Sequence, residues 1–351
     1  MSKYLTFLFL LYFTDSDAQL AVSLQKYYEY TNKAEYAIVT NKKTEASEFY
    51  NKAFQLKEEP FFADIYNSFV VNVEIRNIDY ARQNYKSLKC LDYNFSTIKD
   101  SLFFKNFEEN NRDFIKGIIC RKSENLKLSK TLDSLYEKDQ LYRKMAMFSD
   151  VTYTKDIKNG DSLNAHRLKN IFDLYGFKNE YDLHLSKTTN PPILPYQYII
   201  IHQQRSGKNK IINFIPLLYK AVQEGKLRNK DFVMLKEEFG TLERDYSYFP
   251  LYIIDGNCCV VKKSIFVENR NAEERGKIEQ VELNRRRIAL TDLNTSMLYK
   301  FFNQKNKKYK LEPLNAMTLF LDKETKEKWS EHSIEIKFED YLNYLNDKNN
   351  K

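Results

Sequence analysis

The chain has 351 residues, and its 56 Lys and Arg against 48 Asp and Glu give a formal net charge of +8. Apolar residues make up 42% and aromatic residues 15% of the chain, a composition that excludes a disordered protein. The 8 Gly and 7 Pro are well below average usage, which disfavours a β-sandwich, a β-barrel or a glycine-rich phosphate-binding enzyme and favours a mainly helical fold.

Residues 1–18 have the pattern of a secretory signal peptide. Lys3 provides a positive charge, residues 4–13 are an apolar run, and Ser16 and Ala18 occupy the −3 and −1 positions of a cleavage site. We therefore expect export to the periplasm or the medium after cleavage near Ala18. A buried N-terminal helix is the alternative. The run is too short to span a bilayer, and no longer one follows, so we expect a soluble mature chain without a transmembrane segment.

A weak internal repeat, with a shift of 35 residues, relates the segment at 45–54 to the segment at 80–89. Ala46, Tyr50 and Ala53 have a small–aromatic–small spacing that lets two helices approach closely. This pattern resembles the second helix of a tetratricopeptide repeat, whose period is about 34 residues.

The first helices of these repeats are predicted at 24–39 and 60–76. Residues 97–148 are expected to add further helices, the last of which carries an amphipathic leucine stripe and caps the repeats. The sequence thus predicts a tetratricopeptide-like helical unit over residues 19–148.

Residues 149–351 are predicted to form a second, α-rich domain with a β-hairpin near 250–267. Asp161 is the expected N-cap of a helix that ends at Gly176, and a further helix ends at Gly225. Helix is expected again around 271–305. The predicted fold class is therefore mainly α, with N-terminal TPR-like helical hairpins followed by an α+β domain containing a small β-hairpin.

The order of short motifs in this second half resembles an exported bacterial family that is classed only as a domain of unknown function and often follows helical repeats. The motifs are Asp161-x-x-Asn164, Tyr175-Gly176-Phe177, His202-Gln203 and Asn284 to Leu290 leading to Tyr299. The resemblance covers about residues 135–302. The chain departs from the family at 234–237, where the family has an Asp-Arg pair, and at 246–249, where it has Tyr-Gly-Thr-Gln. The resemblance implies a fold and domain boundaries rather than a reaction.

Four cysteines occur, Cys90, Cys120, Cys258 and Cys259. Export permits disulfides, and Cys90 can pair with Cys120 if their segments are neighbours. The alternative is four small buried apolar residues. Because the chain has no CxxC and no Cys–His cluster at ligand spacing, no metal site is predicted.

The candidate catalytic residues are His202, Asp161 and Asn164. His202 follows the apolar run 198–201, which predicts a partly buried imidazole, and Asp161 and Asn164 are candidates to face and orient it. The alternative is a hydrogen-bonded core histidine, with Asp161 capping a helix whose first turn contains Asn164. The chain has no GxSxG, HExxH or GxGxxG, so no cofactor is predicted.

These patterns favour an exported, non-enzymatic protein- or peptide-binding module. An uncharacterised enzyme with its site around His202 is the alternative, and a toxin-like or immunity-like factor is a third reading. Export disfavours nucleic acid as a partner. The basic runs at 285–287 and 305–310 are interpreted as solvated helix faces, with binding of anions or lipid headgroups as the alternative.

Overall fold

The computed structural model describes most of the chain. The described residues are 20–120, 125–146, 153–183, 194–205, 212–237, 245–247, 251–254, 257–262, 272–311, 316–319 and 333–349. The predicted signal peptide, residues 1–18, lies outside them. Among the described residues, no helix combines the length and the apolar character that crossing a membrane requires.

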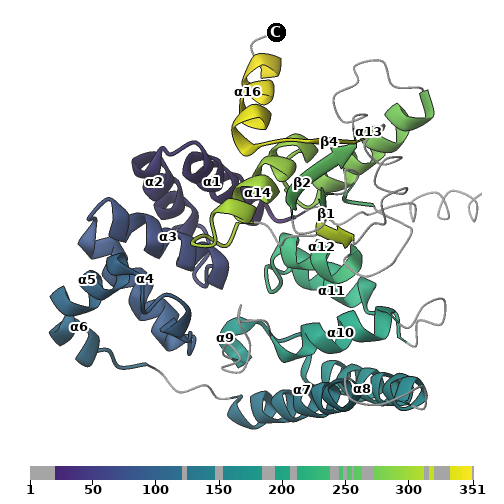
Figure 1. The fold of residues 1–351 in the computed structure, drawn as a ribbon. Helices are drawn as coiled ribbons and strands as arrows, with labels where there is room; N and C mark the ends of the chain where they lie inside the picture. The colour runs from purple at the N-terminus through teal and green to yellow at the C-terminus, as the bar shows by residue number, and fades with distance from the viewer. Residues whose placement is uncertain are drawn as a thin grey trace, which may run out of the picture.

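The described chain consists mainly of helices (Figure 1). The helices of the first half are α1 (Val22–Val39), α2 (Lys43–Phe54), α3 (Phe62–Glu74), α4 (Ile78–Cys90), the 3-10 helix η1 (Phe95–Thr97), α5 (Leu102–Asn110), α6 (Arg112–Lys116) and α7 (Leu126–Ala146). Those of the second half are α8 (Tyr153–Tyr175), α9 (Glu180–Leu183), α10 (Pro195–Arg205), α11 (Ile215–Gln223), α12 (Asn229–Glu237), α13 (Ala272–Arg287), α14 (Leu293–Lys305) and α16 (Phe338–Asn349).

The first four helices pack as consecutive hairpins, since α1 contacts α2, α2 contacts α3, and α3 contacts α4. The helices predicted at 24–39 and 60–76 are confirmed to within two residues. Ala46, Tyr50 and Ala53 are completely buried, because their small–aromatic–small spacing lies on the face of α2 that packs against its neighbours. The identity of the repeat stays a prediction.

Cys90, the last residue of α4, forms a disulfide with Cys120, with the two Cα atoms 5.1 Å apart. The alternative of four unpaired cysteines is therefore wrong for this pair. Cys258 and Cys259 lie on β2, and their side chains are outside the described part of the structure.

Helices α7, α8 and α10 form a second helical layer, at the bottom of Figure 1. The leucine stripe of α7, Leu128, Leu132 and Leu135, is buried as expected. However, α7 packs against α8 and α10, so it does not cap the N-terminal hairpins. Its apolar face is covered by apolar residues of α8 and α10, which belong to the same core cluster.

The prediction that Asp161 caps a helix is wrong. Helix α8 begins at Tyr153, so Asp161 and Asn164 lie in its interior. The predicted helix ends are confirmed at Gly176 and Gly225, whose φ angles of 69° and 67° are in the left-handed region that glycine adopts without strain.

The helix expected around 271–305 is two helices, α13 and α14. They are separated by a turn in which Ala289 has a φ of 55°. Arg285 is buried in this turn and donates to the carbonyl oxygens of Thr291 and Tyr246, both at 2.6 Å. The interpretation of 285–287 as a solvated face is therefore wrong for Arg285, which fixes the turn.

In the described part of the chain, four short strands form one mixed sheet in the order β3-β1-β2-β4. The strands are β1 (Leu251–Ile254), β2 (Asn257–Lys262), β3 (Ala316–Leu319) and β4 (Ser333–Glu335). β1 pairs antiparallel with β2 and parallel with β3, and β2 pairs antiparallel with β4. The sheet thus takes its outer strands from the C-terminal region.

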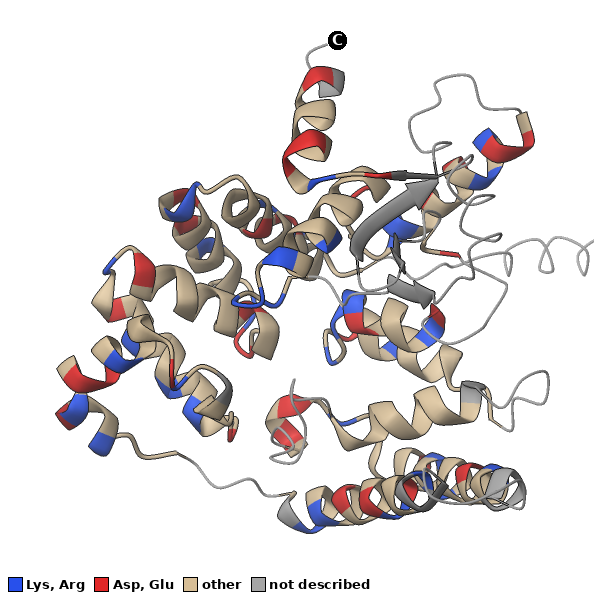
Figure 2. Ribbon diagram, viewed as in Figure 1, with Lys and Arg blue, Asp and Glu red and all other residues tan. Residues whose placement is uncertain are grey.

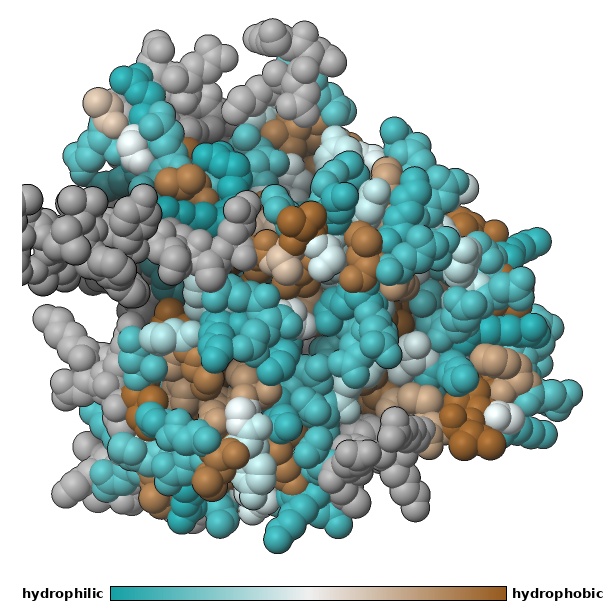
Figure 3. All heavy atoms as spheres, turned by 180° about the vertical axis from the view of Figure 1, so that it is seen from behind, coloured by the Kyte–Doolittle hydropathy of each residue, from teal (hydrophilic) through white to brown (hydrophobic). Residues whose placement is uncertain are grey.

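The predicted fold class, TPR-like hairpins followed by an α+β domain containing a small β-hairpin, is wrong as a description of the fold, although β1 and β2 pair antiparallel where the hairpin is predicted. The structure is a predominantly helical fold in which the short strands are a minor element. Each of its two apolar cores contains residues from both halves of the chain. One core joins Tyr66 of α3 to Leu298 of α14, and the other joins Tyr28 of α1 to Leu218 of α11. Because the two halves share both cores, neither half buries its apolar faces alone. Seen from behind, the surface is largely hydrophilic, with small separate hydrophobic groups (Figure 3).

Candidate functional site

Helices α8 and α10 place the three sequence-predicted residues in one buried region. His202 lies on α10 and is only 7% exposed, and Asp161 and Asn164, one turn apart on α8, are also buried. The partly buried imidazole that the apolar run predicts is confirmed.

Two residues of α7 join these side chains into one chain of contacts. Asp139 Oδ2 lies 2.7 Å from His202 Nδ1, and Asp139 Oδ1 accepts from Arg143 at 3.0 Å. The same guanidinium donates to Asp161 Oδ1 at 2.7 Å. Asp161 therefore reaches His202 only through Arg143 and Asp139, and Asp139 is the carboxylate that orients the imidazole.

Burial governs the electrostatics of this His202 cluster, which we define as Asp139, Arg143, Asp161, Asn164 and His202. Burial raises the pKa of the Asp161 carboxyl above its ordinary value, although the hydrogen bond from Arg143 acts in the opposite direction. Asn164 Nδ2 is buried without a hydrogen-bond partner among the described residues.

The sequence interpretation missed Asp139 and Arg143, although α7 carries a signal for the first of them. The buried stripe Leu128, Leu132 and Leu135 continues at helical spacing to position 139. An aspartate on the apolar face of a helix needs a buried partner. The spacing does not reveal that the partner is His202, 63 residues further along the chain.

An imidazole whose Nδ1 faces a carboxylate has the arrangement of a general base. Such a base must reach its substrate. His202 is nearly enclosed, the Tyr198 ring lies beside it at 6.1 Å between centroids, and neither of the two pockets described below includes it. Within the described residues, no group of three or more His, Cys, Asp or Glu side chains is placed to hold a metal ion. Within the described residues, the cluster links the helices α7, α8 and α10 through buried polar contacts.

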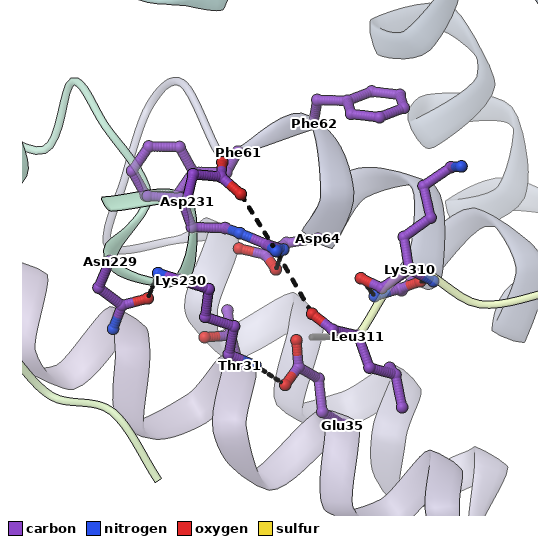
Figure 4. A network of polar contacts seen from close by, with 12 residues as sticks. Thr31, Glu35, Phe61, Phe62, Asp64, Asn229, Lys230, Asp231, Lys310 and Leu311 are labelled. Carbon is purple, nitrogen blue, oxygen red and sulfur yellow. Dashed lines mark hydrogen bonds and ion pairs between the residues drawn. The ribbon is translucent and has the colours of Figure 1, made fainter. Parts of the chain in front are cut away.

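A second buried network, which we call the junction network, holds α1 and α3 against α12 and the segment before β3 (Figure 4). Asp64 accepts from the Tyr27 hydroxyl at 2.6 Å and lies 3.7 Å from Arg228 Nη1. Arg228 also donates to the Leu311 carbonyl oxygen at 3.3 Å. The two contacts of Arg228 join segments that are more than 80 residues apart in sequence.

The junction network also contains carboxyl groups that burial makes harder to ionise. Burial raises the pKa of Glu35 to about 7, although its hydrogen-bonded partner Lys230 acts to lower it. Burial likewise raises the pKa of Glu180, which accepts from the Phe62 backbone N–H, to about 8. Perturbed carboxyls can mark functional sites, but these are packed between helices, where they fasten the two halves together.

An open groove lies between the first helical hairpin and the start of α14. It has a volume of about 370 Å³. Its apolar lining comes from Tyr36 and Ala37 of α1, Phe49 of α2 and Tyr299 of α14. This volume falls within the range of sites that hold small ligands or single side chains of a partner.

Charged residues surround the apolar part of this groove. On α1, Lys33 pairs with Glu29 at 2.6 Å. Lys42, directly before α2, lies 3.6 Å from Glu45 of that helix, and both pairs are exposed to solvent. Asp292, which caps α14 by accepting from two backbone N–H groups, completes the rim. The groove therefore combines an apolar floor with charges of both signs at its edge.

Comparison with known proteins gives no identification. No known protein family, curated protein or solved structure matches this chain. The resemblance to tetratricopeptide repeats and to the exported family of unknown function therefore stays a prediction.

Proposed function

We propose that the protein is an exported, non-enzymatic module that binds a peptide segment of a partner protein. The groove between α1, α2 and α14 is the observation that carries this proposal. Helical hairpins commonly present such surfaces to extended peptides, and aromatic residues supply much of the contact area in protein interfaces.

The lining of the groove specifies the chemistry of the peptide. Tyr36, Ala37 and Phe49 offer contact to one large apolar side chain. The rim pairs Lys33–Glu29 and Lys42–Glu45 are solvent-exposed and already neutralised, so they contribute little net charge. The expected ligand is a peptide with an aromatic or branched aliphatic anchor flanked by polar residues of either charge.

The alternative proposal, an enzyme with its site around His202, has weaker support. Asp139 pairs with the imidazole Nδ1 of His202 and with Arg143 inside the cluster, and the imidazole is nearly enclosed. The exposed fraction of His202 is only 7%, and a general base must come within hydrogen-bond distance of the proton that it removes.

The disulfide between Cys90 and Cys120 supports the export part of the proposal. Disulfides persist in the periplasm and outside cells and are rare in reducing compartments. The bond closes a loop that contains the half-buried Phe114 and the short helix α6.

Selection from a displayed random peptide library tests the proposal. The wild type is expected to enrich peptides that share one apolar anchor. Phe49→Ala, which removes an apolar wall of the groove, should weaken their binding about tenfold or more, as expected for an interface anchor. Phe114→Ala is the matched control, because Phe114 is also half-buried beside a cation but lies outside the groove.

Two outcomes would count against peptide binding at the groove. One is a selection that enriches no common sequence. The other is a set of enriched peptides that bind Phe49→Ala as tightly as the wild type.

A further inference from the structure

Helices α7 and α8 lie side by side at one edge of the molecule (Figure 1), and the exposed face of this hairpin carries cations that have no carboxylate partner. A shallow pocket of about 440 Å³ lies on this face. Its charged lining consists of Lys127, Lys130 and Lys138 from α7 and Arg167 from α8, and no acidic residue lines it.

The cations of this pocket form no ion pairs with the described carboxylates. Elsewhere on the surface, exposed lysines pair with carboxylates of their own helix, as Lys169 does with Asp173 at 2.5 Å. Within the described part of the chain, no ion pair forms with the four cations of the pocket. Their positive field therefore remains available to an external anion.

Exposed leucines lie on the same helix faces as these cations. On α7, the positions Lys130, Ser134 and Lys138 continue at helical spacing to Leu141, which is 53% exposed. On α8, Arg167 lies between Leu163 and Leu174 on one face, at spacings of four and seven residues, and these leucines are 51% and 77% exposed.

We propose that this α7–α8 face docks on the surface of a membrane that contains anionic lipids. Lysine and arginine bind lipid phosphate groups, and neighbouring leucines enter the boundary between headgroups and acyl chains. Unpartnered cations alone would suit a dissolved phosphate equally well. The exposed leucines beside them favour a lipid surface, because a small soluble anion leaves them in water.

The orientation of the two helices suits a flat surface. The internal side chains of the hairpin, including Asp139 and Asp161, point into the layer formed with α10. The four cations of the pocket and the leucines beside them are exposed on the opposite side of the hairpin. The groove at α1, α2 and α14 is lined by different residues, so this proposal does not depend on peptide binding.

Co-sedimentation of the purified protein with lipid vesicles tests the proposal. We expect binding to phosphatidylcholine vesicles in which about a third of the lipid is phosphatidylglycerol, and little binding to pure phosphatidylcholine. Lys130→Gln combined with Arg167→Gln should weaken binding about 25-fold, since each basic residue near an anionic surface contributes about fivefold. Lys86→Gln combined with Arg112→Gln, at exposed positions on α4 and α6, removes the same charge and should leave binding within about twofold.

A second pair of measurements separates a lipid surface from a dissolved phosphate. Leu163→Ser combined with Leu174→Ser should weaken vesicle binding at least about tenfold without altering the circular dichroism spectrum. Soluble glycerol phosphate should not displace the protein from vesicles.

Three results would overturn the proposal. They are equal binding to neutral and anionic vesicles, equal losses in the Lys130/Arg167 and Lys86/Arg112 variants, and unchanged binding of the double leucine variant together with displacement by glycerol phosphate. The last result would assign the pocket to a soluble phosphate compound.

Discussion

Replacement of Arg143 by Met tests whether the His202 cluster holds three helices together. Methionine replaces the aliphatic part of the arginine side chain with an apolar chain of similar length, but it removes the cation between Asp139 and Asp161. Both carboxylates are buried, and each loses a hydrogen bond of 3.0 or 2.7 Å.

The expected cost follows from the burial of the three groups. Breaking a buried ion pair from one side costs about 3–5 kcal/mol. The Arg143 side chain is 23% exposed, so water partly solvates the site, and we expect a loss near the lower end, about 3 kcal/mol. The pH dependence has a definite sign. Because the pKa of Asp161 is already raised and rises further without Arg143, the folded variant retains the Asp161 proton to higher pH than the unfolded chain. The loss is therefore smallest near pH 4 and grows towards neutral pH.

Urea unfolding at pH 7 and near pH 4, followed by circular dichroism, measures these differences. Arg167→Met is the matched control, because it removes an arginine of α8 that is exposed on the outer face, and it should change stability by less than about 0.5 kcal/mol. The His202 cluster does not hold the helices together as proposed if Arg143→Met lowers the free energy of unfolding no more than Arg167→Met does, or if the loss grows as the pH falls.

Two further predictions concern features that fasten the fold. Replacing Cys90 and Cys120 by Ser opens a loop with a sequence separation of 30. Chain entropy predicts that this lowers the free energy of unfolding by about 3.6 kcal/mol. Equal unfolding midpoints for the variant and the oxidised wild type would contradict this. Because the pKa of Glu35 is raised to about 7 and that of Glu180 to about 8, the stability that they confer is fully present below about pH 4.5 and is lost as the pH rises to about 8. Glu35→Gln should flatten this decline, whereas the exposed Glu48→Gln should not, and identical pH profiles in thermal unfolding would refute the assignment.

Local sequence signals predicted local structure well. Gly176 and Gly225 end α8 and α11 in the left-handed conformation. The residue after a helix commonly takes this conformation, and glycine adopts it without steric strain, so a glycine after an apolar helical stripe predicts the helix end. The apolar run before His202 likewise predicted a buried imidazole, since burial of a short run depends on its own composition.

Interactions between distant segments determine the start of α8, the partner of His202 and the fold class, none of which the local sequence predicted. Asp161 follows Asn159-Gly160, a typical helix boundary, yet α8 continues through Gly160 because α7 and α10 cover its apolar face. Asp139 is paired with His202 across a separation that no periodicity encodes. The fold class was wrong for the same reason, because the cores shared by the two halves arise from contacts between distant segments.

Hydrogen–deuterium exchange of the protein with and without a selected peptide shows where on the protein the peptide binds. For binding at the groove we expect slower exchange in the segments that line it, within α1, α2 and the first turns of α14 (Figure 2 shows these helices with their charged positions), and unchanged exchange in α7, α8 and α10. Protection centred on the His202 cluster of α7, α8 and α10, with none at the groove, would contradict peptide binding at the groove and favour a function of the region around His202.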